Sequence, residues 1–157
     1  VSQNVQTKNM SDFERESVDF IYSINVLEHI DDDEFVLEQF FSSIKQQGKL
    51  FIYVPAFMFL WTELDTSVGH FRRYSKKDLI AKIEAAGFKV TKVRYADSLG
   101  YILLTLHKLI FHKFSLEKRK LIIFDRLIFP LSIILDKILL NRLFGKNLYV
   151  YAEKSEA

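Results

Sequence analysis

The sequence contains no cysteine among its 157 residues. Disulfide bonds and thiolate metal sites are therefore excluded, as is typical of an intracellular protein. Glycine is also scarce: its five copies, at positions 48, 69, 87, 100 and 145, all stand singly. The sequence therefore offers no glycine-rich loop of the kind that cradles a cofactor. The formal net charge of +2 is too small to indicate a nucleic-acid partner.

The first 13 residues, VSQNVQTKNMSDF, contain no apolar segment and so do not form a signal peptide. They also lack a starting methionine, and we expect the chain to be a piece of a longer one. What the sequence does contain is apolar, with 49% hydrophobic and 15% aromatic residues. This length and composition predict one globular domain with a sizeable core.

The stretch VDFIYSINVLEHI, residues 18–30, is the segment from which we interpret the rest of the chain. Its first part, Val18–Ile24, is a nearly continuous apolar run that predicts a strand buried on both faces, as in a parallel sheet covered by helices. Four acidic residues follow at 31–34, where carboxylates favour the start of a helix and can cap it. Asn25, Glu28 and His29 then lie at the carboxyl tip of the strand, where α/β sheets place their ligands.

The remaining periodic segments predict an alternation of helices and strands. Apolar residues at helical spacing predict a helix over 33–47 with Gly48 as its left-handed cap, followed by a strand over 49–54 that Pro55 ends. Together with the first strand these make a parallel βαβ unit. After a long aromatic loop over 55–74, we expect a helix capped by Ser75 and ended by Gly87, a strand near a sheet edge at 88–95 and a last strand at 147–152.

Residues 101–145 are strongly apolar and predict a helical insertion before the last strand. Within it, 121–140 has the length of a membrane helix, but Asp125, Arg126, Asp136 and Lys137 interrupt it, so we interpret it as amphipathic. Its apolar face is open to three interpretations: packing on the sheet, pairing with another subunit as a homo-oligomer, or contact with a membrane surface. The last is favoured by a basic edge consisting of Lys108, Lys113, Lys118, Arg119 and Lys120.

Four segments in order, INVLEHIDDD, GKLFIYVPAF, LWTELDTSVGHFRRYS and EAAGFKV, resemble the C-terminal two-thirds of class I S-adenosylmethionine (SAM)-dependent methyltransferases. The closest subgroup carries NVLEHI, VPA, LW, D, GH and RRY in this order. The resemblance is strong over 18–100 and weak at 147–152. It implies a partial methyltransferase domain spanning 1–157, with 101–145 as an insertion.

The fold that this resemblance implies is an α/β Rossmann-like sheet of seven strands whose last strand is antiparallel. The four predicted strands, at 18–24, 49–54, 88–95 and 147–152, would be its fourth to seventh. The family's first strand, its glycine-rich turn and the acidic residue that binds the ribose have no counterpart here. We therefore expect an N-terminally truncated methyltransferase, incomplete for SAM binding, with the edge of its first strand exposed.

The strand tip carries the first group of predicted site residues. The resemblance implies that Asn25, Val26, Leu27 and Glu28 contact the methionine part of SAM; an Asn that caps a turn and core packing of the two apolar residues are the structural alternatives. His29 beside a carboxylate could act as a general base, or simply bond to the backbone. A metal site of His29 with the acids at 31–33 is disfavoured, since a helix start explains those acids, and no metal is expected.

The loop at 55–74 carries the second group. His70 is the predicted general base, and Asp65, Arg72, Arg73 and Tyr74 are predicted substrate contacts, because paired arginines bind phosphate or carboxylate. The structural alternative is that Asp65 pairs with Arg72 or Arg73 and only stiffens the loop, with His70 bonded to the backbone.

The resulting functional hypothesis is methyl transfer from SAM to oxygen or nitrogen of a small or lipid-linked acceptor, in the cytoplasm or at a membrane. The alternative is a non-catalytic α/β interaction module or a split subunit that needs a partner.

Overall fold

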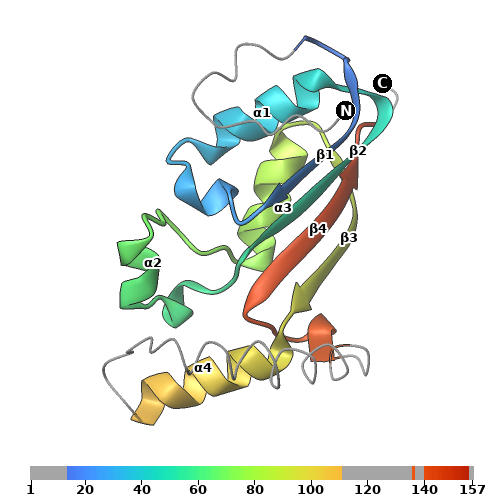
Figure 1. Cartoon of the computed structure of the whole chain (residues 1–157). Coiled ribbons are helices and arrows are strands. Elements are labelled where there is room, and N and C mark those ends of the chain that lie inside the picture. Colours follow the sequence, from blue (N-terminus) through green and yellow to red (C-terminus); the bar gives the residue numbers. More distant parts are fainter. Residues whose placement is uncertain (1–13, 111–135, 137–139, 156–157) are drawn as a thin grey trace.

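A computed structural model of the protein describes residues 14–110, 136 and 140–155 (Figure 1). Its helices of five or more residues are α1 (Asp33–Ser43), α2 (Glu63–Ser67), α3 (Lys76–Ala85) and α4 (Ser98–Ile110). Short 3-10 helices lie at Leu27–His29, Met58–Leu60 and Leu140–Arg142. The strands are β1 (Val18–Ile24), β2 (Ile44–Pro55), β3 (Lys89–Ala96) and β4 (Asn147–Glu153).

The described strands form one mixed sheet in the order β1-β2-β4-β3. β1 and β2 run parallel, whereas β4 lies between β2 and β3 and is antiparallel to both. The parallel βαβ unit, the antiparallel last strand and the edge position of β3 were all predicted, and all are confirmed.

Two helices, α1 and α3, contact each other and cover the same face of the sheet (Figure 1). Buried aliphatic side chains fill the space between these helices and the strands, and they include Leu37, Ile52, Leu79, Ile83 and Val150. Both helices lead into the next strand with almost no connection, since β2 starts directly after α1 and β3 starts at Lys89 after α3, so their apolar faces pack against that sheet. Asp32 caps α1 by accepting a hydrogen bond from the Phe35 backbone N–H, as the acidic run predicts.

The predicted boundary between the first helix and the second strand is wrong. The helix ends at Ser43 instead of residue 47, since Ile44 is already extended and pairs with Val18 of β1. Gly48 is therefore no helix cap but a strand residue, and a Cβ built there would approach the Asp19 carbonyl oxygen to 3.0 Å. The positive φ that a left-handed cap would require occurs instead at Gln47, where φ is 63°.

The prediction that Val18–Ile24 is buried on both faces is also wrong. β1 is an edge strand, and Phe20, Tyr22 and Ile24 are each about half exposed, at 51%, 58% and 49%. Only Ser23 is fully buried within β1. The apolar run identified the strand correctly, but these three side chains alternate with the core-facing ones and so lie on the sheet face that the described residues leave partly uncovered.

Of the predicted helical insertion, α4 and the short helix Leu140–Arg142 are described, and 111–135 and 137–139 lie outside the described residues. No helix within the described ranges is both long and apolar enough to cross a membrane. The carboxylate of Asp136 accepts hydrogen bonds from the backbone N–H groups of Asp97 and Ser98, which are free donors at the start of α4.

Candidate functional site

The tip of β1 ends in a backbone turn that Asn25 makes. Its φ is +50°, a conformation that asparagine tolerates better than most residues, and its N–H donates to the Tyr53 carbonyl. Asn25 and Val26 are exposed at this tip. The 3-10 helix that follows points Leu27 into the core, buries Glu28 and leaves His29 exposed.

The loop from Pro55 to Tyr74 is more ordered than the sequence prediction of a loop suggests. Thr62 and Asp65 form a reciprocal capping box that starts α2, and its Thr-x-x-Asp pattern is readable in the sequence. After α2, the Phe71 backbone N–H donates to the Glu28 carbonyl over 2.8 Å. This bond fastens the loop to the turn at the tip of β1, so residues about 40 apart in the sequence meet.

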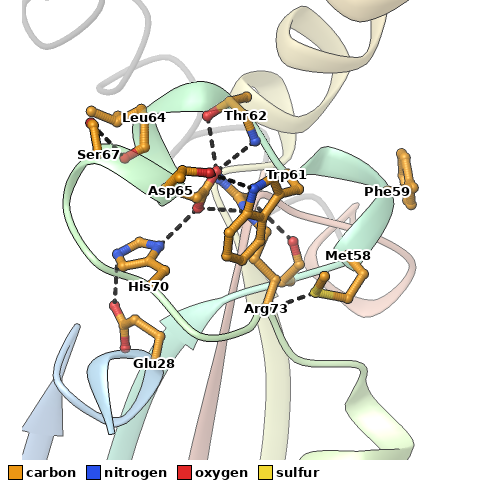
Figure 2. A network of polar contacts seen from close by, with 12 residues as sticks. Glu28, Met58, Phe59, Trp61, Thr62, Leu64, Asp65, Ser67, His70 and Arg73 are labelled. Carbon is orange, nitrogen blue, oxygen red and sulfur yellow. Dashed lines mark hydrogen bonds and ion pairs between the residues drawn. The ribbon is translucent and has the colours of Figure 1, made fainter. Parts of the chain in front are cut away.

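Asp65 is the centre of the loop's polar network (Figure 2). Its side chain accepts hydrogen bonds from Arg73 Nε and from the Thr62 backbone N–H, each over 2.8 Å, and its Oδ1 lies 2.8 Å from His70 Nδ1. Burial alone would raise the pKa of Asp65, but the bonds from Arg73, Thr62 and His70 outweigh it and hold the pKa below its usual value. Asp65 is therefore an ionised carboxylate, locked in place.

Glu28 faces the opposite edge of the same imidazole (Figure 2). Its Oε1 lies 3.9 Å from His70 Nε2, and its side chain is buried, with 1% of the residue exposed. Burial raises the pKa of Glu28 to about 7. His29 completes the group, with its ring packed edge-to-face against His70 at a centroid distance of 4.5 Å. The structure thus brings both predicted catalytic histidines and Glu28 together.

The two adjacent arginines do not form a joint clamp. Arg73 turns toward Asp65 and contacts both carboxylate oxygens, whereas Arg72 turns toward the start of α1 and contacts the Asp33 carboxylate over 2.8 Å. The Asp65–Arg73 pairing of the structural alternative is therefore present, but His70 bonds to a carboxylate rather than to the backbone. Tyr74 is fully buried, and its hydroxyl donates to Asp33. Substrate contact by these residues stays a prediction.

Sequence reasoning missed a second polar centre at Asp33. It was assigned only a role at the helix start, yet its buried carboxylate also accepts hydrogen bonds from Lys82 and Tyr74, each over 2.7 Å. Another missed contact is Lys108 on α4, whose ammonium donates to the carbonyls of Phe59 and Trp61. Nothing in the sequence near Asp33 or Lys108 predicts these distant contacts. Of the proposed basic edge, Lys108 is the described member, and it is used in this contact.

A parallel strand pair extended by an antiparallel strand, with polar residues at the parallel strand tip, is a Rossmann-like arrangement. The chain belongs to the methyltransferase domain family, whose model matches residues 1–93. Among curated proteins, none matches the sequence.

Solved structures share the fold over nearly the whole chain. A methyltransferase in complex with the Haloferax volcanii Trm112 methyltransferase activator superposes with a TM-score of 0.58 at 16% identity, covering 92% of this chain and 57% of the other. A SAM-dependent methyltransferase from Archaeoglobus fulgidus gives 0.55 at 15% identity, covering 92% and 63%. Phosphoethanolamine N-methyltransferase 2 from Haemonchus contortus, in complex with SAM, gives 0.54 at 17%, covering 92% and 35%. The chain thus spans less than two thirds of the length of these relatives.

Proposed function

We propose that the chain contributes the acceptor side of a SAM-dependent methyltransferase site, for transfer to oxygen or nitrogen of a small or lipid-linked acceptor. The observation that carries this proposal is the meeting of the β1 tip with the loop at 62–74 around one oriented imidazole, His70. The methyl group and its leaving sulfur would come from SAM, so the protein's task is to align and deprotonate the acceptor.

In this proposal His70 accepts the proton of an acceptor hydroxyl or ammonium group. Asp65 lies against His70 Nδ1, which keeps the proton on that nitrogen and leaves the lone pair on Nε2. The same carboxylate stabilises the imidazolium that forms. His29 and Trp61 flank the ring, with Trp61 at a centroid distance of 6.5 Å, and so limit its rotation.

Asn25 and Val26 are the residues that fit the cofactor. They are exposed at the tip of a parallel strand, and the left-handed turn at Asn25 leaves its side chain and the next peptide open to a ligand. Leu27 fits less well, because its side chain belongs to the core. Glu28 lies on the histidine side of the turn.

The lipid-linked part of the proposal is supported by α4. Leu103, Leu106 and Leu109 are exposed at 37%, 49% and 73%, at a spacing of three residues that puts them along one side of the helix. An exposed apolar helix face of this kind suits contact with an acyl or isoprenoid chain, or with a membrane surface.

We also infer that complete SAM binding needs further polypeptide over the sheet face that carries Phe20, Tyr22 and Ile24, either from the same protein or from a partner subunit. The exposed apolar side chains of Phe20, Tyr22 and Ile24 support this, as does the short span of the chain relative to the solved structures. A split subunit is therefore the second candidate, favoured by the same edge strand.

Calorimetric titration with SAM tests the proposal, with the chain compared to a longer version extended before residue 1. We expect the longer version to bind and Asn25→Gly, which keeps the positive φ, to weaken binding by about tenfold. Gln47→Gly is the matched control, because it removes another side chain at positive φ far from the β1 tip. If neither version binds SAM, the non-catalytic interaction module is the remaining hypothesis.

A further inference from the structure

Glu28 is a buried acid, with only 1% of the residue exposed. Among the described residues, neither of its carboxylate oxygens has a hydrogen-bond partner. Buried polar atoms are almost always paired, because an unpaired one forfeits its hydration without compensation. His70 Nε2, at 3.9 Å, is beyond hydrogen-bond reach. Their 3.9 Å separation therefore suits an ion placed between the two atoms and bound to both.

His70 presents its free nitrogen toward Glu28. Asp65 Oδ1 lies 2.8 Å from Nδ1, and an ionised carboxylate can only accept, so Nδ1 carries the proton. Nε2 then carries the lone pair on the Glu28 side. A carboxylate behind a histidine in this way is the usual outer partner of a metal-binding imidazole. Here Arg73 and Thr62 fix that carboxylate in turn.

His29 supplies a third donor from the other side. A ring nitrogen of His29, a ring nitrogen of His70 and a carboxylate oxygen of Glu28 all lie within 4.8 Å of one another. Ligand bonds of about 2.0–2.2 Å in tetrahedral geometry separate neighbouring ligand atoms by about 3.4 Å. Small side-chain rotations therefore close the set around one ion. His29 is exposed, which leaves the ion accessible to solvent.

We propose that Glu28, His29 and His70 bind a divalent first-row transition-metal ion, with Zn²⁺ as the representative of the class. Two imidazoles and one carboxylate suit zinc or iron(II), whereas Mg²⁺ and Ca²⁺ prefer oxygen ligands. The set differs from the acids at 31–33 considered in the sequence, since Asp33 is already bonded to Lys82 and Tyr74. Water or an acceptor oxygen completes the coordination on the open side.

This inference goes beyond the proposed function and does not rest on it, because metal binding needs neither SAM nor a methyl acceptor. The two roles of His70 exclude each other at any moment, since a proton and a metal ion use the same lone pair of Nε2. An active enzyme that binds no zinc would refute the metal site alone, and a zinc-binding protein without activity would refute the proposed function alone.

The test is calorimetric titration of the chelator-treated chain with ZnCl₂, with MgCl₂ titrated in parallel. We expect one zinc site and no magnesium site. Loss of an outer partner such as Asp65 is expected to weaken zinc binding by roughly 10- to 100-fold. Loss of a ligand should weaken it further, in each of the variants Glu28→Gln, His29→Gln and His70→Gln. Asp19→Asn, which removes an exposed carboxylate elsewhere, should bind zinc like the unaltered chain.

Two further measurements keep the test decisive. Circular dichroism checks the folding of each variant. If the substitution of Glu28 or His70 unfolds the chain, the zinc affinity of His29→Gln tests the site, because His29 is exposed and its substitution should not disturb the fold. X-ray absorption of the zinc complex should find two imidazole ligands, a signature that a purely structural role for the cluster would not produce. Unchanged zinc affinity in the folded variants, or no zinc binding by the unaltered chain, would overturn the proposal.

Discussion

The Asp33 carboxylate joins the start of α1 to the end of the loop and to α3, which follow it by 41 and 49 residues, so its charge should be a main source of stability. Its Oδ1 accepts a hydrogen bond from Lys82 of α3 over 2.7 Å and lies 2.8 Å from Arg72 of the loop. Its Oδ2 accepts a hydrogen bond from the buried Tyr74 hydroxyl. Asp33→Asn keeps the shape of the side chain and an acceptor for Tyr74, but it removes the charge.

The magnitude follows from the burial of the three partners. Breaking a buried ion pair by neutralising one member destabilises a protein by about 3–5 kcal/mol, since the other charge remains buried. The Asp33 side chain is 2% exposed, whereas those of Lys82 and Arg72 are 15% and 25% exposed and so recover some hydration. We therefore expect the lower end of that range, about 3 kcal/mol.

Urea unfolding at pH 7, followed by the fluorescence of Trp61, the single tryptophan, measures this loss. For a domain with an m value of about 2 kcal/mol per M, the midpoint should fall by roughly 1.5 M. Asp31→Asn is the matched control: it also contacts Arg72, but its side chain is 82% exposed, and such pairs contribute about 1 kcal/mol at most. A loss of less than 1 kcal/mol in Asp33→Asn would refute the reasoning.

The same carboxylate sets a pH dependence with a definite sign. Burial alone would raise the pKa of Asp33, but the hydrogen bonds from Lys82 and Tyr74 and the nearby positive charges outweigh it and lower the pKa. A group with a lowered folded-state pKa stabilises the fold above its unfolded pKa, and this contribution is lost as pH falls through the folded value. The stability difference between the unaltered chain and Asp33→Asn should therefore be constant from pH 5 to 7 and shrink below about pH 4.

Further substitutions test other parts of the structure. Gly87→Ala should destabilise the chain by about 3 kcal/mol in urea unfolding, because φ is +104° and a Cβ would lie 2.8 Å from the Phe41 ring. Gly69→Ala is the control: its φ is +78° but its surroundings are open, so it should lose only about 1 kcal/mol. Lys108→Met should increase hydrogen exchange in the 58–61 segment, which Lys108 ties to α4, and unchanged exchange would contradict that role. Tyr22→Lys should lower self-association in sedimentation velocity and change the stability by no more than about 0.5 kcal/mol, because the side chain lies exposed on the edge strand. If the variant associates as strongly as the unaltered chain, that edge is not the contact.

The sequence predicted β1 and β2 because each contains a short apolar run, ended at Asn25 and at Pro55. It misplaced the end of α1 because the segment IKQQ, residues 44–47, has no strong preference of its own. Two distant partners decide its conformation: Ile44 pairs with Val18, and the Gln47 backbone N–H donates to the Lys154 carbonyl. Those contacts are made across the sheet, so a local window does not contain them.

The members of the candidate site were predictable as residue types, but their pairing was not. Arg72 and Arg73 look like a twin clamp in the sequence, yet side chains of successive residues in extended chain point to opposite sides. One arginine therefore meets Asp33 and the other meets Asp65. The sequence places Glu28 beside His29, but it does not reveal that Glu28 is buried against His70.

The divergence of the two arginines holds the site on two sides. Arg72 ties one side of the loop to α1, and Arg73 ties the other side to α2 through Asp65. His70 lies just before both and contacts the same Asp65, so protein side chains set the orientation of the imidazole. A site arranged in advance in this way spends little binding free energy on ordering its own side chains. Glu28 is the exception within that network, and its unpaired oxygens mark where, among the described residues, the arrangement is incomplete until something binds.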